Sequence, residues 1–234
     1  MTWTPSHTGG VFPSPIARRR RAWTPLCWGG VRGGGRASAS PTIKRVLALA
    51  LLLAGLVLFG QGAYIHAKAA LAQILLERAF VTTVATGRVT KPWSWADTWP
   101  VARIAVKRLD ASAIALAGSS GQALAFGPGH VGGTAEPGER GIAVYSAHRD
   151  THFRFLKDVS IGDEITVTRR DGRTFRYRAD RSAIVRFDAS GLDPLAGGHE
   201  LVLSTCWPFD AVTPGPLRYL LHATLIEDRS AGLP

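Results

Sequence analysis

The feature that most constrains this chain is an apolar run of 20 residues, from Val46 to Ile65, that carries no charged side chain. About 20 apolar residues in a helix span the hydrocarbon core of a bilayer, whereas a buried core helix is rarely apolar on all faces for so long. A cleaved signal peptide is the nearest alternative because small residues follow the run, but its apolar region is typically shorter. We therefore expect an uncleaved transmembrane helix over 43–65.

Basic residues gather in front of this run. The chain has 28 Lys and Arg against 17 Asp and Glu, a net charge of +11. Residues 1–65 hold eight of the bases and no acid, so the rest of the chain is nearly balanced. Bases in front of a span stay cytoplasmic. This predicts a single-pass inner-membrane protein with a cytoplasmic N-terminus and a periplasmic C-terminal part, and the balanced remainder argues against nucleic-acid binding.

Two segments flank the predicted span. Residues 1–42 are rich in Pro, Gly, Ser and Arg without periodicity, so we expect a disordered basic cytoplasmic tail. Residues 66–100 are expected to form a membrane-proximal helix and a Trp-rich linker. The Ala- and Leu-rich stretch His66–Thr83 favours the helix, and Lys91-Pro92 breaks it. Three tryptophans within seven residues then favour an interfacial belt or a docked linker over a ligand platform.

Beyond residue 101 the chain reads as β-structure. Short apolar stretches alternate with turn residues about every ten residues, and Asp171-Gly172 is typical of a hairpin turn. Eight short strands predict an all-β domain over 101–228, a closed eight-stranded β-barrel with short helices, followed by a tail at 229–234. The candidate strands are Ala102–Val106, Ala113–Ala117, Ile142–Ser146, Glu164–Arg169, Thr174–Arg178, Ala183–Phe187, Glu200–Thr205 and Arg218–Ile226.

Three reactive side chains stand at strand ends. Cys206 closes an apolar strand and is followed by Trp207-Pro208, where the ladder must stop. Taken alone, such a cysteine is more often an inert core residue. His148, however, follows a second apolar strand, and Arg218 opens the last one. A thiolate nucleophile, a proton-donating imidazole and a cation facing an oxyanion are what a cysteine transferase needs.

The segments around these residues resemble the signatures of the sortase family. They are VYSAHRDTHF at 144–153, LSTCWPF at 203–209 and PGPLRY at 214–219. The resemblance covers about residues 45–228 and is strongest to the Gram-negative, marine proteobacterial type. It implies a membrane-anchored cysteine transpeptidase on an eight-stranded β-barrel. We predict no cofactor and assign no metal ligand, and the sequence leaves metal dependence open.

The resemblance also implies a mechanism. Cys206 matches the nucleophile, which attacks the Thr–Gly carbonyl of an LPxTG-like signal at the C-terminus of a protein substrate. His148 matches the family histidine and protonates the departing amine. Arg218 matches the family arginine, which holds the signal backbone and the developing oxyanion. A Cys thioester results and passes the acyl group to an amine acceptor that the sequence does not identify.

A second group is expected to bind substrate: Thr205, Ala147 and Trp207. Thr205 matches the residue that helps to position the sorting signal. Two departures from the family pattern stand out. Val202 replaces the threonine that begins the T-L-x-T-C pattern, and Ala147 replaces the glycine before the histidine. The extra methyl of Ala147 is expected to affect substrate fit more than catalysis.

The remaining polar candidates are weaker. Asp150 is placed to orient His148 as in a catalytic triad, although a solvated strand end is the favoured interpretation. Asp188 and Asp193 share a loop, but two carboxylates are a poor signal for calcium. Four other histidines lack ligand spacing and are expected to be surface or structural residues. They are His130, His152, His199 and His222.

Two other functions remain open at this stage. A cysteine endopeptidase would use the same site and release its substrate to water. A non-catalytic, membrane-anchored barrel would only bind a partner's tail. Product analysis with and without a primary amine separates the first from a transpeptidase, and full biological activity of a Cys206→Ala variant would favour the second.

Overall fold

The computed structural model describes residues 41–194 and 196–228. The expected tails at 1–42 and 229–234 therefore lie almost wholly outside the described residues. The chain divides between Leu51 and Leu52 into two units. A single helix, α1 (Pro41–Thr86), contains this division and covers both the predicted span and the segment predicted to follow it.

Helix α1 has two parts with different surroundings. Its apolar side chains are exposed throughout the run that ends at Ile65, and the helix is long and apolar enough to cross a membrane. From Ala72 onward, by contrast, one face is buried, with Leu76 and Phe80 almost inaccessible. The helix ends at Thr86 because Gly87 adopts a positive φ of 67°, a conformation that favours glycine after a helix. It thus stops before the predicted break at Lys91-Pro92.

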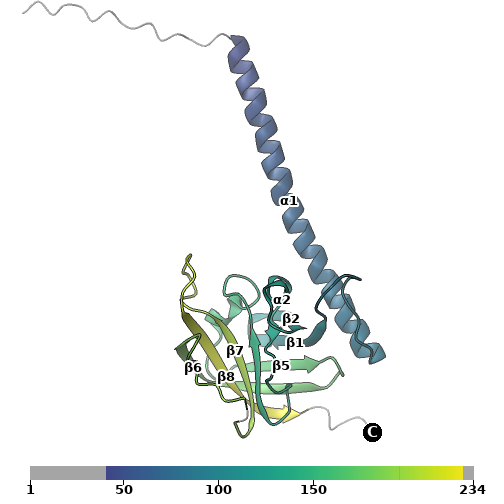
Figure 1. Cartoon of the computed structure of the whole chain (residues 1–234), viewed down its shortest axis with the longest axis vertical. Coiled ribbons are helices and arrows are strands. Elements are labelled where there is room, and N and C mark those ends of the chain that lie inside the picture. The colour runs from purple at the N-terminus through teal and green to yellow at the C-terminus, as the bar shows by residue number, and fades with distance from the viewer. Residues whose placement is uncertain (1–40, 195, 229–234) are drawn as a thin grey trace, which may run out of the picture. The chain divides into compact units, whose positions relative to one another are not determined.

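Eight strands close into one barrel in the order β1-β2-β3-β4-β7-β8-β6-β5 (Figure 1). This confirms the predicted fold class, including the short helices. The strands are β1 (Pro100–Val106), β2 (Ala111–Ala117), β3 (Gly129–His130), β4 (Gly141–Ser146), β5 (Glu164–Arg169), β6 (Thr174–Arg186), β7 (His199–Cys206) and β8 (Leu217–Asp228). The short helices are η1 (Lys107–Leu109), α2 (Gly121–Phe126) and η2 (Arg154–Asp158).

Two strands differ from the sequence prediction. The segments predicted as separate strands over 174–178 and 183–187 form the single strand β6. Its polar middle reads as a turn, but a register shift between Ala179 and Arg181 lets β6 bend while it stays paired with β8. Strand β3 was not predicted, because its two residues lie among Gly and Pro that are typical of a turn.

The pairing directions decide what meets at each end of the barrel. Strand β1 is antiparallel to β2, β2 is parallel to β3, β3 is antiparallel to β4, and β4 is parallel to β7. The carboxyl ends of β1, β4 and β7 therefore lie at the same end. Strand β8 begins at that end as well, because it runs antiparallel to β7.

Side chains alternate between two faces along β7. Leu201, Leu203 and Thr205 point into the barrel, where the main core contains large rings such as Tyr145 and Phe175. Val202 points outward and joins a smaller apolar cluster on the outer face of the sheet. That cluster also contains Ile142, Val144 and Leu220, with Leu192 and Ala196 of the β6–β7 loop packed against it.

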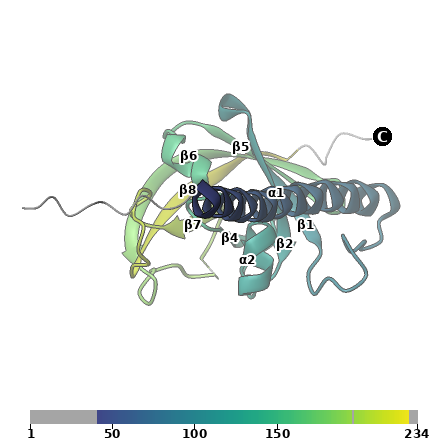
Figure 2. The same cartoon turned by 90° about the horizontal axis from the view of Figure 1, so that it is seen from above.

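A third cluster joins the end of α1 to the barrel. Leu76 and Phe80 of α1 pack with residues of β2 and with Ala123 of α2, which lies beside β2 (Figure 2). An ion pair between Glu77 and Arg103 adds a polar contact, and the Arg103 guanidinium lies over the Phe80 ring, 5.0 Å from its centroid. This part of α1 is thus an integral helix of the barrel domain.

Candidate active site

The ends of β7 and β8 place a cysteine directly opposite an arginine. Cys206, the last residue of β7, is paired across the ladder with Arg218 of β8. Directly opposite residues of antiparallel strands have Cβ atoms about 5 Å apart. Since Thr205 points inward, alternation turns Cys206 and Arg218 to the outer face. The Cys206 thiol is free and half-buried.

The Arg218 guanidinium is held by its own loop. Its Nη1 donates to the carbonyl oxygens of Gly215 and Leu217, at 2.9 and 2.8 Å. The same group lies over the ring of Phe187, 5.7 Å from the centroid. Phe187 is in turn tied to the loop by a backbone hydrogen bond to Pro216. These contacts fix the position of the guanidinium on the residue that is paired with Cys206 across the ladder.

His148 reaches the same rim from β4. The parallel register of β4 and β7 pairs Ser146 with Ser204, and the Ala147 N–H then donates to the Ser204 carbonyl at 3.1 Å. Ala147 is buried and His148 is exposed, so His148 lies on the outer face beside the end of β7. In the described part of the chain, no residue forms a hydrogen bond with the His148 side chain.

Thr205 and Ala147 link the two strands inside the barrel. The buried Thr205 hydroxyl donates to the Ala147 carbonyl at 2.7 Å. Both side chains point into the core, on the face opposite that of Cys206. The bond ties the residue before the cysteine to the residue before the histidine, so these two residues set the relative position of Cys206 and His148.

Trp207 belongs to an aromatic group at the end of β7. Its ring stacks on Tyr219, with centroids 6.1 Å apart, and meets the edge of Phe209 at 5.3 Å. The backbone N–H of Trp207 donates to the Leu217 carbonyl, and the peptide bond from Trp207 to Pro208 is cis. The residue is half-buried and thus anchors the β7–β8 loop as well as facing solvent.

Arg149 is a residue that sequence reasoning missed. Its guanidinium hydrogen-bonds to the carbonyls of Ala211 and Thr213 in the β7–β8 loop, the latter at 3.0 Å. It therefore joins the segment that carries His148 to the loop that precedes Arg218. The only sequence signal was its position next to His148, because its acceptors are backbone atoms more than 60 residues away.

The carboxylates near the site are not arranged as a triad or a metal site. Asp150 is exposed, and within the described ranges its side chain has no hydrogen bond to His148. Asp188 is paired with Arg186 through two hydrogen bonds, and this bonding lowers the pKa of its carboxyl. Across residues 41–194 and 196–228, no group of three or more His, Cys, Asp or Glu side chains could hold a metal ion.

The predicted structural histidines have varied roles. His222 is buried and shares the Glu200 carboxylate with Arg181 on the outer face of the barrel. His152 follows the site histidine by four residues. Burial lowers the pKa of His152, and a hydrogen bond with the Ala125 backbone partly offsets this effect.

A thiol, a guanidinium and an imidazole on one rim of a closed barrel are the groups that a cysteine acyltransferase requires. The sequence model of the Sortase domain matches residues 104–226, which is more than half of the chain and runs from β1 to β8. The chain belongs to the sortase family, whose members are cysteine transpeptidases.

Individual sortases show the same relationship. Sortase D of Bacillus subtilis is 28% identical over 194 residues, which cover 77% of this chain and 98% of that protein. Among solved structures, the Clostridium perfringens Sortase D5 transpeptidase has a TM-score of 0.54 at 20% identity, covering 68% of this chain and 99% of that one. Sortase A of Corynebacterium diphtheriae, a lid mutant, has a TM-score of 0.51 at 24% identity, covering 68% and 95%. These two structures show the shared fold.

The chain does not span every relative in full. It covers 65% of the length of Sortase C1 of GBS Pilus Island 1, at 26% identity and a TM-score of 0.49. The specific likeness to the Gram-negative type stays a prediction.

Proposed function

We propose that this protein is a membrane-anchored sortase that cleaves an LPxTG-like signal between Thr and Gly and transfers the acyl group to an amine. The observation that carries the proposal is the pairing of Cys206 with Arg218 at the end of β7, beside the strand end that presents His148. Family membership supports a cysteine transpeptidase. The residue roles and the signal are our proposal.

In the first half-reaction, the Cys206 thiolate attacks the Thr carbonyl carbon. The C–S bond forms, the Thr–Gly C–N bond breaks, and His148 as imidazolium gives its proton to the departing nitrogen. Free thiols have a pKa near 8.5 and need a positive neighbourhood to ionise at neutral pH. Arg218 supplies a permanent cation beside the sulfur and N–H donors for the oxyanion.

In the second half-reaction, an amine attacks the thioester carbon. The new C–N bond forms, the C–S bond breaks, and neutral His148 takes a proton from the attacking nitrogen. The sulfur leaves as thiolate and the starting state is restored. Water in place of the amine would give hydrolysis, which is the endopeptidase alternative.

We further propose that α1 anchors the enzyme in the inner membrane with its N-terminus cytoplasmic and its barrel periplasmic. The exposed apolar side chains up to Ile65 support an anchor. The bases in front of the run support the orientation. A protein substrate tethered to the same bilayer would meet the enzyme at a raised effective concentration, so a short signal would suffice for recognition.

The test uses the full chain in detergent micelles. The protein is incubated with LPxTG peptides varied at the third position, with and without triglycine, and followed by mass spectrometry. We expect an acyl adduct on Cys206 and a triglycine-linked product. The adduct should vanish in Cys206→Ala and persist in Cys27→Ala, the variant of the other cysteine.

Two results would overturn the proposal. Cleaved peptide without triglycine product, at any triglycine concentration, would identify an endopeptidase. Binding of the peptide without cleavage or adduct would identify a non-catalytic barrel.

A further inference from the structure

An exposed aromatic ring lies at the end of β6, next to the candidate active site. It belongs to Phe187, which directly follows β6 and is 60% exposed. Around the barrel, β8 lies between β6 and β7. Phe187 therefore approaches Arg218 of β8 from the β6 side, whereas Cys206 belongs to β7 on the other side.

The register of β6 and β8 brings this ring to Arg218. Val185 is paired with Arg218 and packs against the apolar cluster on the outer face of the sheet. Phe187 lies two residues further on, so alternation turns its side chain to the same face. It is then a diagonal neighbour of Arg218, at a separation that aromatic and long side chains bridge. The distance of 5.7 Å between the guanidinium carbon and the ring centroid is within the range of a cation–π contact.

The backbone around Phe187 is fixed on both sides of the ring. The Phe187 N–H donates to the Pro216 carbonyl at 2.9 Å, in the loop that carries the carbonyl acceptors of Arg218. The Ala189 N–H donates to the Arg186 carbonyl at 3.1 Å, and these two residues form a β-bridge that closes the turn after β6. Main-chain hydrogen bonds thus hold the ring where burial does not.

The ring of Phe187 contributes little to the core. Phe187 belongs to none of the apolar clusters of the described chain. Among the described residues, Arg218 is its only ring or charge contact. Because the stabilisation from burial scales with the apolar area removed from water, a ring this exposed adds little to the stability of the fold. The effect of the ring is therefore expected on Arg218.

The contacts of Arg218 leave one edge of its guanidinium unbonded. Nη1 donates to two loop carbonyls, whereas Nε and Nη2 have no hydrogen bond within the described chain. Neither atom is among the buried unpaired atoms of the described residues, so both contact solvent. The Nε–H and one Nη2–H of an arginine point in parallel from one edge of the planar group, a geometry that suits oxygen acceptors. This edge is free to donate to a substrate oxygen.

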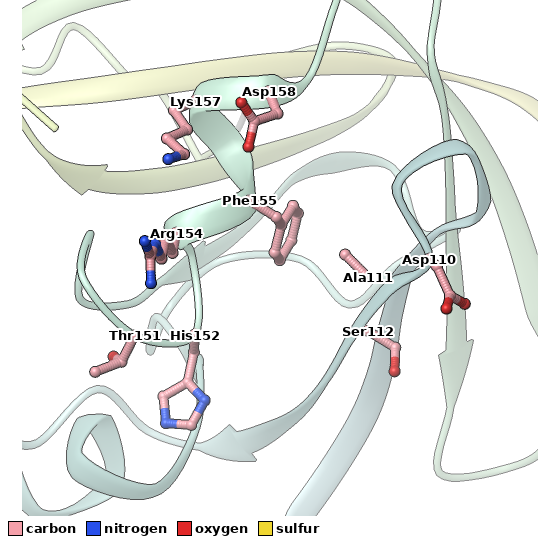
Figure 3. Close-up of a pocket in the computed structure, with 9 residues that line it drawn as sticks. All are labelled: Asp110, Ala111, Ser112, Thr151, His152, Arg154, Phe155, Lys157 and Asp158. Carbon is pink, nitrogen blue, oxygen red and sulfur yellow. The ribbon is translucent and has the colours of Figure 1, made fainter.

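The His148 side of the site gives the guanidinium no comparable support. The segment after β4 borders a hollow of about 650 Å³ (Figure 3). Neither Cys206 nor Arg218 lines it. Its aromatic residue, Phe155, instead meets the ring of Phe153 in a T-shaped contact at 5.8 Å. The contacts that fix the guanidinium come from β6 and from its own loop.

We propose that Phe187 is a positioning residue for Arg218. Its ring holds the plane of the guanidinium, so that the edge with Nε–H and Nη2–H stays available to the oxyanion of the reacting carbonyl. Without the ring, the guanidinium would be held at Nη1 alone and could tilt about that atom. The inference rests on the proposed function, because an oxyanion arises only when Cys206 is acylated or deacylated.

The experiment compares two substitutions of Phe187 in the full chain in detergent micelles, with LPxTG peptides and triglycine. Phe187→Leu keeps an apolar side chain without a ring, and Phe187→Tyr keeps the ring. In Phe187→Leu we expect kcat to fall about two- to fivefold, the size of a cation–π contact at an exposed site. KM should not change, since the oxyanion exists only in the transition state and the intermediates. Phe187→Tyr should restore the wild-type kcat.

Controls separate positioning from a general effect on the fold or on substrate binding. Ile184→Ala, at another exposed apolar side chain of β6, should keep the wild-type kcat, and no variant should change the thermal midpoint. In an Arg218→Lys background, Phe187→Leu should cause no further loss, because residues that act through one contact are not additive. A further two- to fivefold loss in that background, or a change in KM alone, would overturn the inference.

A spectroscopic measurement separates this inference from the proposed function. In protein with ¹⁵N-labelled arginine, the Nε–H signal of Arg218 is identified by its loss in Arg218→Lys. An aromatic ring shields protons over its face, so Phe187→Leu should shift this signal downfield and Phe187→Tyr should not.

The two outcomes are then distinct. A shift that depends on Phe187, in protein whose wild type forms no Cys206 adduct, would support the positioning of Arg218 and overturn the proposed function. A Cys206 adduct that forms with the same kcat in Phe187→Leu as in the wild type would leave the proposed function standing and overturn this inference.

Discussion

The candidate site has two parts, Cys206 with Arg218 on β7 and β8, and His148 after β4. The first part is held by many more contacts than the second. On the β7–β8 side, the ladder pairs Cys206 with Arg218, and the guanidinium is bonded to two carbonyls. On the β4 side, His148 is exposed at the start of an irregular segment, and its side chain has no hydrogen bond with any residue that the structure describes. In the mechanism that we propose, the sulfur and the cation act at one carbonyl group, whereas the imidazole exchanges protons with two different nitrogens. The Arg218 side chain, which would act at one position, has fixed contacts, whereas the His148 side chain, which would serve two nitrogens, has none that restrict it in the described chain.

The largest effect is expected from a substitution of His148, the part of the site with fewer contacts. His148→Gln should lower acylation by about 10²- to 10⁴-fold, the usual contribution of a general acid. Its thermal midpoint should not change, because the exposed side chain makes no hydrogen bond that supports the fold. Stopped-flow acylation and calorimetry on the same sample check both parts. A large drop in midpoint would show that His148 is held more firmly than its contacts indicate.

Arg218→Lys should have the next largest effect. Lysine keeps the charge but loses the planar fork and the contact with Phe187. We expect kcat to fall about 10²-fold, as when one oxyanion donor is removed. Arg186→Lys, on the neighbouring strand, is the matched control and should retain activity. Equal activity of Arg218→Lys and the wild type would mean that a positive charge is sufficient for catalysis and that the planar guanidinium is not required.

Thr205→Val should weaken the connection between the two halves. The substitution keeps the shape but removes the donor to the Ala147 carbonyl, leaving that buried acceptor unpaired. A loss of about 1–3 kcal/mol in the free energy of unfolding is expected from denaturant titration. Thr166→Val on β5, a strand threonine without such a bond in the described chain, should change stability little. Equal stabilities of the two variants would contradict this role.

The smallest expected effect concerns pH. The pKa of His152 is lowered below its ordinary 6.5, chiefly by burial. The unfolded chain thus binds the proton more readily than the folded one, so stability is complete above pH 6.5 and falls as the pH drops from there towards the lowered pKa. His152→Gln should flatten that part of the plot of thermal midpoint against pH. Parallel plots for variant and wild type would refute the assignment.

The sequence predicted the parts of this site that depend on local pattern. Cys206 and His148 each follow an apolar strand, and Pro208 marks where the ladder ends, so their place at strand ends is readable. The contacts of Arg149 and Phe187 are not readable, because they join a side chain to distant carbonyls or to a cation of another strand. Such contacts depend on the register between strands, which no local pattern encodes.

The same limit explains the misjudged strands. A two-residue strand such as β3 has no period to detect, and the bend in β6 resembles a turn until its partner β8 is known. The inward position of Ala147 and Thr205 likewise follows only from the pairing of β4 with β7.

The unbroken course of α1 has a consequence for which substrates the enzyme can serve. Between Leu52 and Thr86 the helix is continuous, and its turns around Leu76 and Phe80 pack into the barrel domain. At 1.5 Å per residue, the portion beyond Ile65 is about 30 Å long. With the apolar stretch in a bilayer as we propose, no irregular linker would separate Leu52 from the barrel domain, so the enzyme could not extend towards a distant target. The substrate would then have to reach the enzyme, and the length of the flexible segment before its sorting signal would decide whether it is processed.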